Sequence, residues 1–248
     1  MSEVKVVTRK NLKKTIYQNE SPKGAPVVGN GRDRSLRDNN SVIPGRESTK
    51  EIQIIAIGAS TGGPLVLQTI LSGLTPNFSI PVLIVQHIAS GFIHNFVDWL
   101  AQTSAIPIHV PKNGEYIIPG HAYIAPDNLQ MGVNKKQRIS LSDSAPENNL
   151  NPSVSYLFRS VTENFGHKSI GILLTGMGRD GAMELKLMRN NGALTIVQDK
   201  ESCVVFGMPK EAMELDAATY ILTPEQIVQA LKILVNPSPR PSPLKGEG

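Results

Sequence analysis

Three side chains that could together perform nucleophilic catalysis each lie at or near the end of a short apolar run. Ser60 lies in I-G-A-S-T-G-G, His87 directly follows V-L-I-V-Q, and Asp180 lies in L-L-T-G-M-G-R-D-G-A. In a serine hydrolase an imidazole takes the proton of the attacking hydroxyl, and a carboxylate orients the ring and stabilises the imidazolium. The sequence therefore indicates a catalytic triad of Ser60, His87 and an acid, for which Asp180 is the first candidate.

The turn around Ser60 has the composition of a nucleophile turn. Gly58, Gly62 and Gly63 are expected to remove side chains from around the hydroxyl, and Pro64 is placed for the first turn of a following helix. The order along the chain is Ser, His, Asp, whereas α/β-hydrolases run Ser, acid, His. An ordinary lipase or esterase fold is therefore disfavoured.

Each of these residues also has a plainer explanation. The Ser60 turn could cradle a phosphate or simply connect a strand to a helix. A histidine after a strand is more often a capping or packing residue, and an acid before a helix interacts favourably with the helix dipole. Asp199 and Asp127 are rivals of Asp180. Because a hydroxyl, an imidazole and a carboxylate all occur at strand ends, one catalytic site explains them better than three unrelated structural roles do.

The elements that must position these residues alternate between strand-like and helix-like patterns. A strand over 52–58, a helix over 64–74 and a strand over 81–86 form a βαβ unit. The pattern continues with expected helices over 91–103, 180–190 and 224–234 and expected strands over 169–174 and 193–197. The predicted fold class is α/β, a doubly wound, mostly parallel sheet with helices on both faces. Parallel strands bring their carboxyl ends to one edge, so Ser60 and His87 should be neighbours.

The stretch over 106–141 breaks this alternation. It contains the short strand-like pieces I-P-I-H-V, E-Y-I-I-P-G-H-A-Y-I-A and Q-R-I-S-L, separated by turns rich in Gly, Pro and Asn. We predict an inserted region of β-hairpins that covers or extends the sheet.

Charge and composition divide the chain of 248 residues into three parts. Residues 1–50 hold eleven Lys/Arg against five Asp/Glu and have no sustained apolar period, so we predict a disordered basic arm. Residues 51–235 form the predicted catalytic domain, with a net charge of −3, and 236–248 a disordered Pro-rich tail. Because the excess positive charge belongs to the arm, a nucleic-acid partner is not expected.

The sequence shows none of the features of a secreted or membrane-spanning protein. A single cysteine, Cys203, allows no intramolecular disulfide, the N-terminus has no apolar leader region, and no stretch reaches the about 18 apolar residues of a membrane span. We expect a cytoplasmic protein without membrane insertion. No sequence feature indicates an oligomeric state.

At these motifs the chain resembles the catalytic domain of chemotaxis protein-glutamate methylesterases, the CheB-type family, over about 54–234. The resemblance rests on six blocks in the same order: I-G-A-S-T-G-G, Q-H, P-G-H-A-Y-I-A-P, P-S-V, L-T-G-M-G-R-D-G-A and S-C-V-V-F-G-M-P. It implies Ser60 as nucleophile, His87 as general base and Asp180 rather than Asp199 as its partner. It also implies an oxyanion hole with the backbone amide of Met177 and with Thr61 close by.

The implied reaction is hydrolysis of glutamate γ-methyl esters on the cytoplasmic helices of methyl-accepting chemotaxis receptors, with release of methanol. Deamidation of receptor glutamines by the same acyl-enzyme route is a secondary implied activity. No metal and no cofactor are required.

The chain departs from the family pattern in three places. Only about fifty polar residues precede the catalytic domain, so the usual receiver domain and control by phosphorylation in cis are not expected. Asn151 and Ser155 stand where a basic and an acidic residue often flank P-S-V on the substrate side, and Gln130 stands near a common histidine. A partner-binding module without turnover is the alternative from another class. Nucleotide binding is disfavoured because the Ser60 turn lacks G-x-G-x-x-G or a Walker lysine.

Overall fold

The computed structural model describes residues 52–235. The predicted basic arm and the predicted Pro-rich tail lie outside the described residues. No helix within 52–235 is long and apolar enough to cross a membrane.

A seven-stranded parallel sheet forms the centre of the fold, with strand order β3-β4-β2-β1-β7-β8-β9. The strands are β1 (Ile54–Ala59), β2 (Val82–Gln86), β3 (Ile108–His109), β4 (Ala122–Ile124), β7 (Ser169–Leu173), β8 (Leu194–Gln198) and β9 (Tyr220–Leu222). The residues of β1, β2, β7 and β8 are buried throughout, because helices cover both faces of the sheet.

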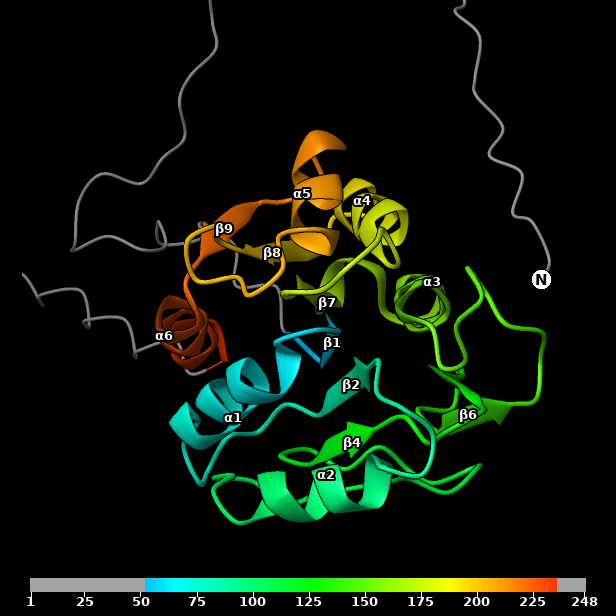
Figure 1. Ribbon diagram of the computed structural model, residues 1–248. Helices are drawn as coiled ribbons and strands as arrows, with labels where there is room; N and C mark the ends of the chain where they lie inside the picture. The colour runs from blue at the N-terminus through cyan, green and yellow to red at the C-terminus, as the bar shows by residue number, and fades with distance from the viewer. Residues whose placement is uncertain (1–51, 236–248) are drawn as a thin grey trace, which may run out of the picture. The chain divides into compact units, whose positions relative to one another are not determined.

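Among the described residues, three helices pack on each face of the sheet, and Figure 1 shows how the two groups lie on opposite sides of it. One face carries α1 (Gly63–Gly73), α2 (Ile93–Ala101) and α6 (Pro224–Val235). The other carries α3 (Val154–Phe165), α4 (Ala182–Asn190) and α5 (Met208–Glu214), with a 3₁₀ turn, η1 (Gly166–Lys168), after α3. Alternate residues of the strands point into the two cores, so Ile55 and Ile57 contact one set of helices and Ile54 and Ala56 the other. The predicted doubly wound α/β fold is confirmed.

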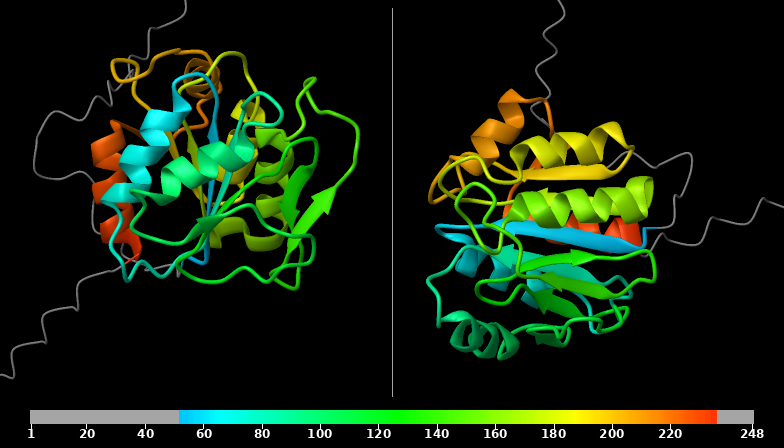
Figure 2. Two further views of the ribbon diagram at one scale, coloured as in Figure 1. Left: turned by 60° about the horizontal axis from the view of Figure 1, so that its bottom comes forward. Right: turned by 90° about the vertical axis from the view of Figure 1, so that its right-hand side faces the viewer.

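The region over 106–141 follows the prediction only in part. β5 (Gln130–Val133) and β6 (Ile139–Ser142) form an antiparallel hairpin, which lies beside α3 in Figure 2. β3 and β4, however, pair in parallel with each other, and β4 pairs in parallel with β2, so they extend the main sheet without forming hairpins. The segment over 110–121 that joins them is about the dozen residues that a parallel crossover needs.

The order of the strands creates a switch point beside β1. From β1 the chain forms β2 and then β3 and β4, which lie on the same side in the spatial order β1-β2-β4-β3, and it then returns to place β7, β8 and β9 on the other side. In sheets of this kind, ligand sites form outside the carboxyl ends of the strands at the point where the direction of winding reverses. That point is the carboxyl end of β1 and β7, where Ser60 and Asp180 follow.

Candidate active site

Ser60 occupies the turn between β1 and α1. Its backbone N–H donates to the Thr175 carbonyl at 3.0 Å, and its own carbonyl accepts from the Gly63 N–H at 2.8 Å. Pro64 lies in the first turn of α1, as predicted. Ser60 is half-buried and directly follows the last residue of β1.

His87 is the first residue after β2 and lies next to the Ser60 turn. The parallel register pairs Ala59 with Gln86, and the His87 N–H donates to the Ala59 carbonyl at 2.9 Å. Adjacent strands are separated by about 4.8 Å. The backbones of Ser60 and His87 are therefore neighbours at one sheet edge, as the strand pattern predicted.

The His87 ring and the Asp180 carboxylate are directly bonded. His87 Nε2 lies 3.0 Å from Asp180 Oδ2, and the His87 side chain is 12% exposed. A neutral imidazole that donates through Nε2 keeps Nδ1 as an acceptor. The Ser60 hydroxyl makes no hydrogen bond within residues 52–235. Catalytic hydrogen bonds are often longer without substrate and shorten when it binds.

The Asp180 carboxylate is held at the N-terminus of α3. Besides the bond to His87, it accepts hydrogen bonds from four groups in the first turn of α3 and the segment before it. These are Val154 N at 2.6 Å, Asn148 Nδ2 at 3.1 Å, Ser155 N at 3.2 Å and Ser153 Oγ at 3.3 Å. The first amides of a helix have no partner within the helix and favour an anion. The acid that follows β7 is therefore fixed by a second element, α3.

These bonds keep Asp180 ionised although it is only 3% exposed. Burial alone would raise the pKa of the carboxyl group, but the hydrogen bonds from His87, Ser155 and Val154 lower the Asp180 pKa to about 2. At neutral pH the group is therefore a permanent negative charge facing His87, which orients the ring and would stabilise a protonated imidazole.

Two of the positions where the chain departs from the family pattern support this arrangement. Gln130 accepts from the Ser153 N–H at 2.8 Å and donates to the Leu150 carbonyl at 3.1 Å, so it fixes the start of α3. Ser155 donates to Glu184 at 2.7 Å and accepts from the Gly181 N–H at 3.0 Å. We expected Ser155 on the substrate side, but the residue is 3% exposed and its N–H is bonded to Asp180, so this was wrong.

The rival acids make other hydrogen bonds. Asp127 accepts from the Gly91 N–H at 2.7 Å, and Asp199 accepts from the hydroxyl and the N–H of Ser202. Neither is bonded to His87. Asp180 is thus the acid that the fold brings to the imidazole.

The two predicted oxyanion donors flank Ser60 but on different turns. Neither the Thr61 nor the Met177 backbone N–H donates a hydrogen bond within residues 52–235. Gly176, which precedes Met177, lies against the nucleophile, because a Cβ added there would be 2.6 Å from the Ser60 Cβ. Met177 is 77% exposed, so its segment is open to a substrate.

The glycines of the Ser60 turn serve packing rather than access. A Cβ on Gly58 would meet Val154, and one on Gly62 would meet Val204. Gly62 also has a φ of 83°, which other residues rarely adopt. Gly58 and Gly62 therefore serve close packing, and Gly62 also serves the sharp turn of the backbone. Gly176, on the neighbouring turn, is the glycine that lies against the Ser60 Cβ.

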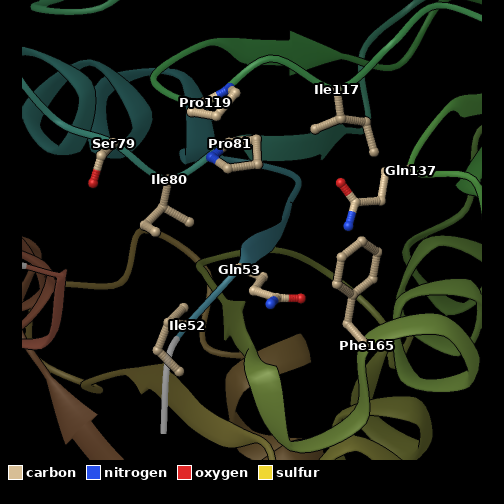
Figure 3. A pocket seen from close by; sticks show the side chains of 9 residues that line it. All are labelled: Ile52, Gln53, Ser79, Ile80, Pro81, Ile117, Pro119, Gln137 and Phe165. Carbon is tan, nitrogen blue, oxygen red and sulfur yellow. The ribbon is translucent and has the colours of Figure 1, made fainter. Parts of the chain in front are cut away.

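A cavity of about 270 Å³ lies away from these residues, around the segments that precede β1, β2 and β4. Figure 3 shows its lining: Ile52, Gln53, Ser79, Ile80, Pro81, Ile117, Pro119, Gln137 and Phe165. It opens at the amino ends of the strands, opposite the edge that bears Ser60. No group of three His, Cys, Asp or Glu side chains within the described residues is placed to hold a metal ion.

A serine turn next to an imidazole that is hydrogen-bonded to a carboxylate, at the edge of a doubly wound sheet, is typical of serine hydrolases. The family model described as CheB methylesterase matches residues 55–231, so the chain belongs to this family. The crystal structure of the Thermotoga maritima CheB methylesterase catalytic domain covers 75% of this chain and 100% of its own, with 36% sequence identity and a TM-score of 0.72.

Two curated relatives carry the name protein-glutamate methylesterase/protein-glutamine glutaminase. The protein of Syntrophus aciditrophicus is 49% identical over 231 residues, which cover 93% of this chain and 61% of the relative. That of Geobacter metallireducens is 57% identical over 195 residues, or 78% of this chain and 55% of the relative. The chain thus spans between half and two thirds of the length of these relatives.

Proposed function

We propose that the chain hydrolyses glutamate γ-methyl esters, with Ser60 as nucleophile, His87 as general base and Asp180 as the acid that orients it. The observation that carries this proposal is the His87 Nε2 to Asp180 bond of 3.0 Å beside the Ser60 turn. His87 Nδ1 takes the Ser60 proton as the hydroxyl oxygen attacks the ester carbonyl. The imidazolium then returns this proton to the leaving methoxide, which departs as methanol.

The second half of the reaction reverses these roles. Water gives a proton to His87 and attacks the acyl-enzyme, which releases glutamate and restores the Ser60 hydroxyl. The negatively charged oxygen of each tetrahedral intermediate would be bound by the Met177 and Thr61 backbone amides. One such donor is worth about 3 to 4 kcal/mol of barrier lowering.

The proposed substrate is a methylated helix in the cytoplasmic part of a chemotaxis receptor, with residues 51–235 as the catalytic domain acting in the cytoplasm. The names of the two relatives, protein-glutamate methylesterase/protein-glutamine glutaminase, support the chemistry. Five of the exposed large apolar side chains support a macromolecular substrate, because they follow the carboxyl ends of β1, β2, β7 and β8: Leu65, Phe92, Met177, Met183 and Val204. Deamidation of a receptor glutamine, with ammonia as leaving group, would follow the same route.

Methanol release from receptor membranes methylated beforehand tests the proposal. Wild-type protein should release methanol, and Ser60→Ala should lose the activity by several orders of magnitude, since removal of the nucleophile abolishes the acyl-enzyme route. A binding module on the same fold would release none and would also leave Ser60 unlabelled by a fluorophosphonate, which phosphonylates activated serines with loss of fluoride.

A further inference from the structure

The side chain of Gln86 connects the two turns that bear the proposed nucleophile and base. Gln86 is the last residue of β2 and is 3% exposed. Its Nε2 donates to the Ser60 carbonyl at 2.8 Å and to the His87 carbonyl at 2.9 Å. A carboxamide nitrogen has two N–H groups, so both bonds form at once. One side chain therefore joins the backbones of both residues.

The surroundings of Gln86 allow only one orientation of the amide. Its Oε1 is buried and has no hydrogen bond within the described residues. A flipped amide would point this oxygen at two carbonyl oxygens. A Cβ on Gly63 would lie 2.2 Å from Oε1, so Gly63 leaves the space that the carboxamide fills. An unpaired buried acceptor is destabilising. Stability alone therefore does not explain a glutamine at this position.

One of the two carbonyl groups bonded to Gln86 already has another hydrogen-bond donor. The Ser60 carbonyl already accepts from the Gly63 N–H at 2.8 Å. The additional bond from Gln86 ties this turn to the carbonyl of His87, whose ring is bonded to Asp180. Because the ring is fixed by Asp180 and the turn by Gln86, the approach of Ser60 Oγ to His87 has few remaining degrees of freedom.

We infer that Gln86 is a positioning residue, which sets the separation of Ser60 and His87 through their backbones. This inference rests on the proposed function, since it assigns Gln86 a part in activating the nucleophile. A misplacement of reacting groups by 1 Å costs about 100-fold in rate. Loss of the carboxamide should therefore slow the attack by Ser60 without changing the affinity for the reagent.

The test is the rate at which an alkyl fluorophosphonate labels Ser60, with the maximal rate and the half-saturating concentration measured separately. In Gln86→Met, which keeps the length of the side chain and removes both donors, the maximal rate should fall about 10- to 100-fold while half-saturation stays unchanged. Thr195→Val is the matched control. It removes the buried bond from Thr195 Oγ1 to the Ala217 carbonyl, of 2.6 Å, within the β8 and β9 region.

The outcomes separate the two proposals. Wild-type protein that is not labelled at Ser60 overturns the proposed function itself. A labelled wild type with an equal maximal rate in Gln86→Met overturns the positioning role, as does an equal fall in Thr195→Val, which would indicate general loosening. Thermal melts establish that each variant is folded at the assay temperature. Gln86→Leu, which also lacks the donors, replaces Gln86→Met if the latter does not melt cooperatively.

Discussion

At the scale of single residues, the ionised carboxylate of Asp180 fixes the orientation of the His87 ring. Its lowered pKa links the site to the stability of the fold. A carboxyl group whose pKa is lowered by folding stabilises the native state at pH values above its unfolded pKa, and this stabilisation is lost as the pH falls through the folded pKa. For Asp180 the pKa falls from 3.8 to about 2, so the window of loss lies between about pH 4 and pH 2.

Asp180→Asn should therefore destabilise the protein by about 2 kcal/mol at pH 7, and the difference from wild type should shrink as the pH is lowered from 4 toward 2. Urea unfolding of both proteins at a series of pH values measures this difference. Asp127→Asn, which alters an exposed loop bond, should stay within about 0.5 kcal/mol of wild type. A difference for Asp180→Asn that is constant from pH 7 to pH 3 would contradict the expectation.

Cys203 is the other nucleophilic side chain near these turns, and its environment makes it unreactive. Burial, with the negative charge of Asp199, raises the pKa of the Cys203 thiol from 9.0 to about 11. The thiolate is the reactive form, so its population at pH 8 is about 100-fold lower than for an ordinary thiol. Iodoacetamide should label native Cys203 correspondingly slowly and label it at the ordinary rate in urea. Fast labelling of native protein would show an exposed thiolate.

At the scale of elements, the strands bearing the site could be predicted because their signals are local. The runs before Ser60, His87 and Asp180 are apolar and β-branched, and each ends in a turn rich in glycine or polar residues. The predicted helices over 64–74, 180–190 and 224–234 match α1, α4 and α6 within two residues. Parallel packing then brings the ends of β1, β2 and β7 to one edge.

The sequence analysis missed three elements, of which α3 holds Asp180 by hydrogen bonds. α3 was not predicted, although Val154, Leu157, Phe158 and Val161 follow a helical period and Ser153 caps the helix by accepting from the Tyr156 N–H. α5 and β9, with seven and three residues, are too short for a clear period. The hydrogen bonds that hold Asp180 join residues about 25 to 32 positions apart, and no local sequence pattern predicts such contacts.

Gly176 tests how closely the turn after β7 must approach the turn after β1. A Cβ at this position would lie 2.6 Å from the Ser60 Cβ and 2.5 Å from the Met208 Sδ. Gly176→Ala should therefore cost about 1 to 3 kcal/mol and displace Ser60. We expect at least a tenfold loss of fluorophosphonate labelling, measured on protein shown to be folded.

The control for this change is Gly114→Ala. Gly114 has a φ of 78° and no atom near an added Cβ, so alanine there costs about 1 to 2 kcal/mol of backbone strain without touching the site. Labelling of Ser60 should be unchanged in this variant. Equal loss of labelling in both glycine variants would mean that stability, and not the contact with Ser60, sets the reactivity.

At the scale of the whole described region, the two sheet edges have different characters. Polar side chains and carbonyl groups converge at the carboxyl edge, whereas the cavity of about 270 Å³ opens at the amino edge. Around the carboxyl edge, exposed apolar side chains follow four of the strands. This distribution favours a substrate that contacts the protein well beyond the ester group.

Phe92→Ser tests that expectation, because Phe92 follows β2 and is 57% exposed. If it contacts the receptor, its loss should cost about 1 kcal/mol of binding, which raises KM for methylated receptor membranes roughly fivefold. Fluorophosphonate labelling of Ser60 should not change, since this small reagent is not expected to contact Phe92. Ile233→Ser is the matched control, because Ile233 is 52% exposed but lies on α6. An unchanged KM in Phe92→Ser, or an equal rise in Ile233→Ser, would exclude this residue from the substrate surface.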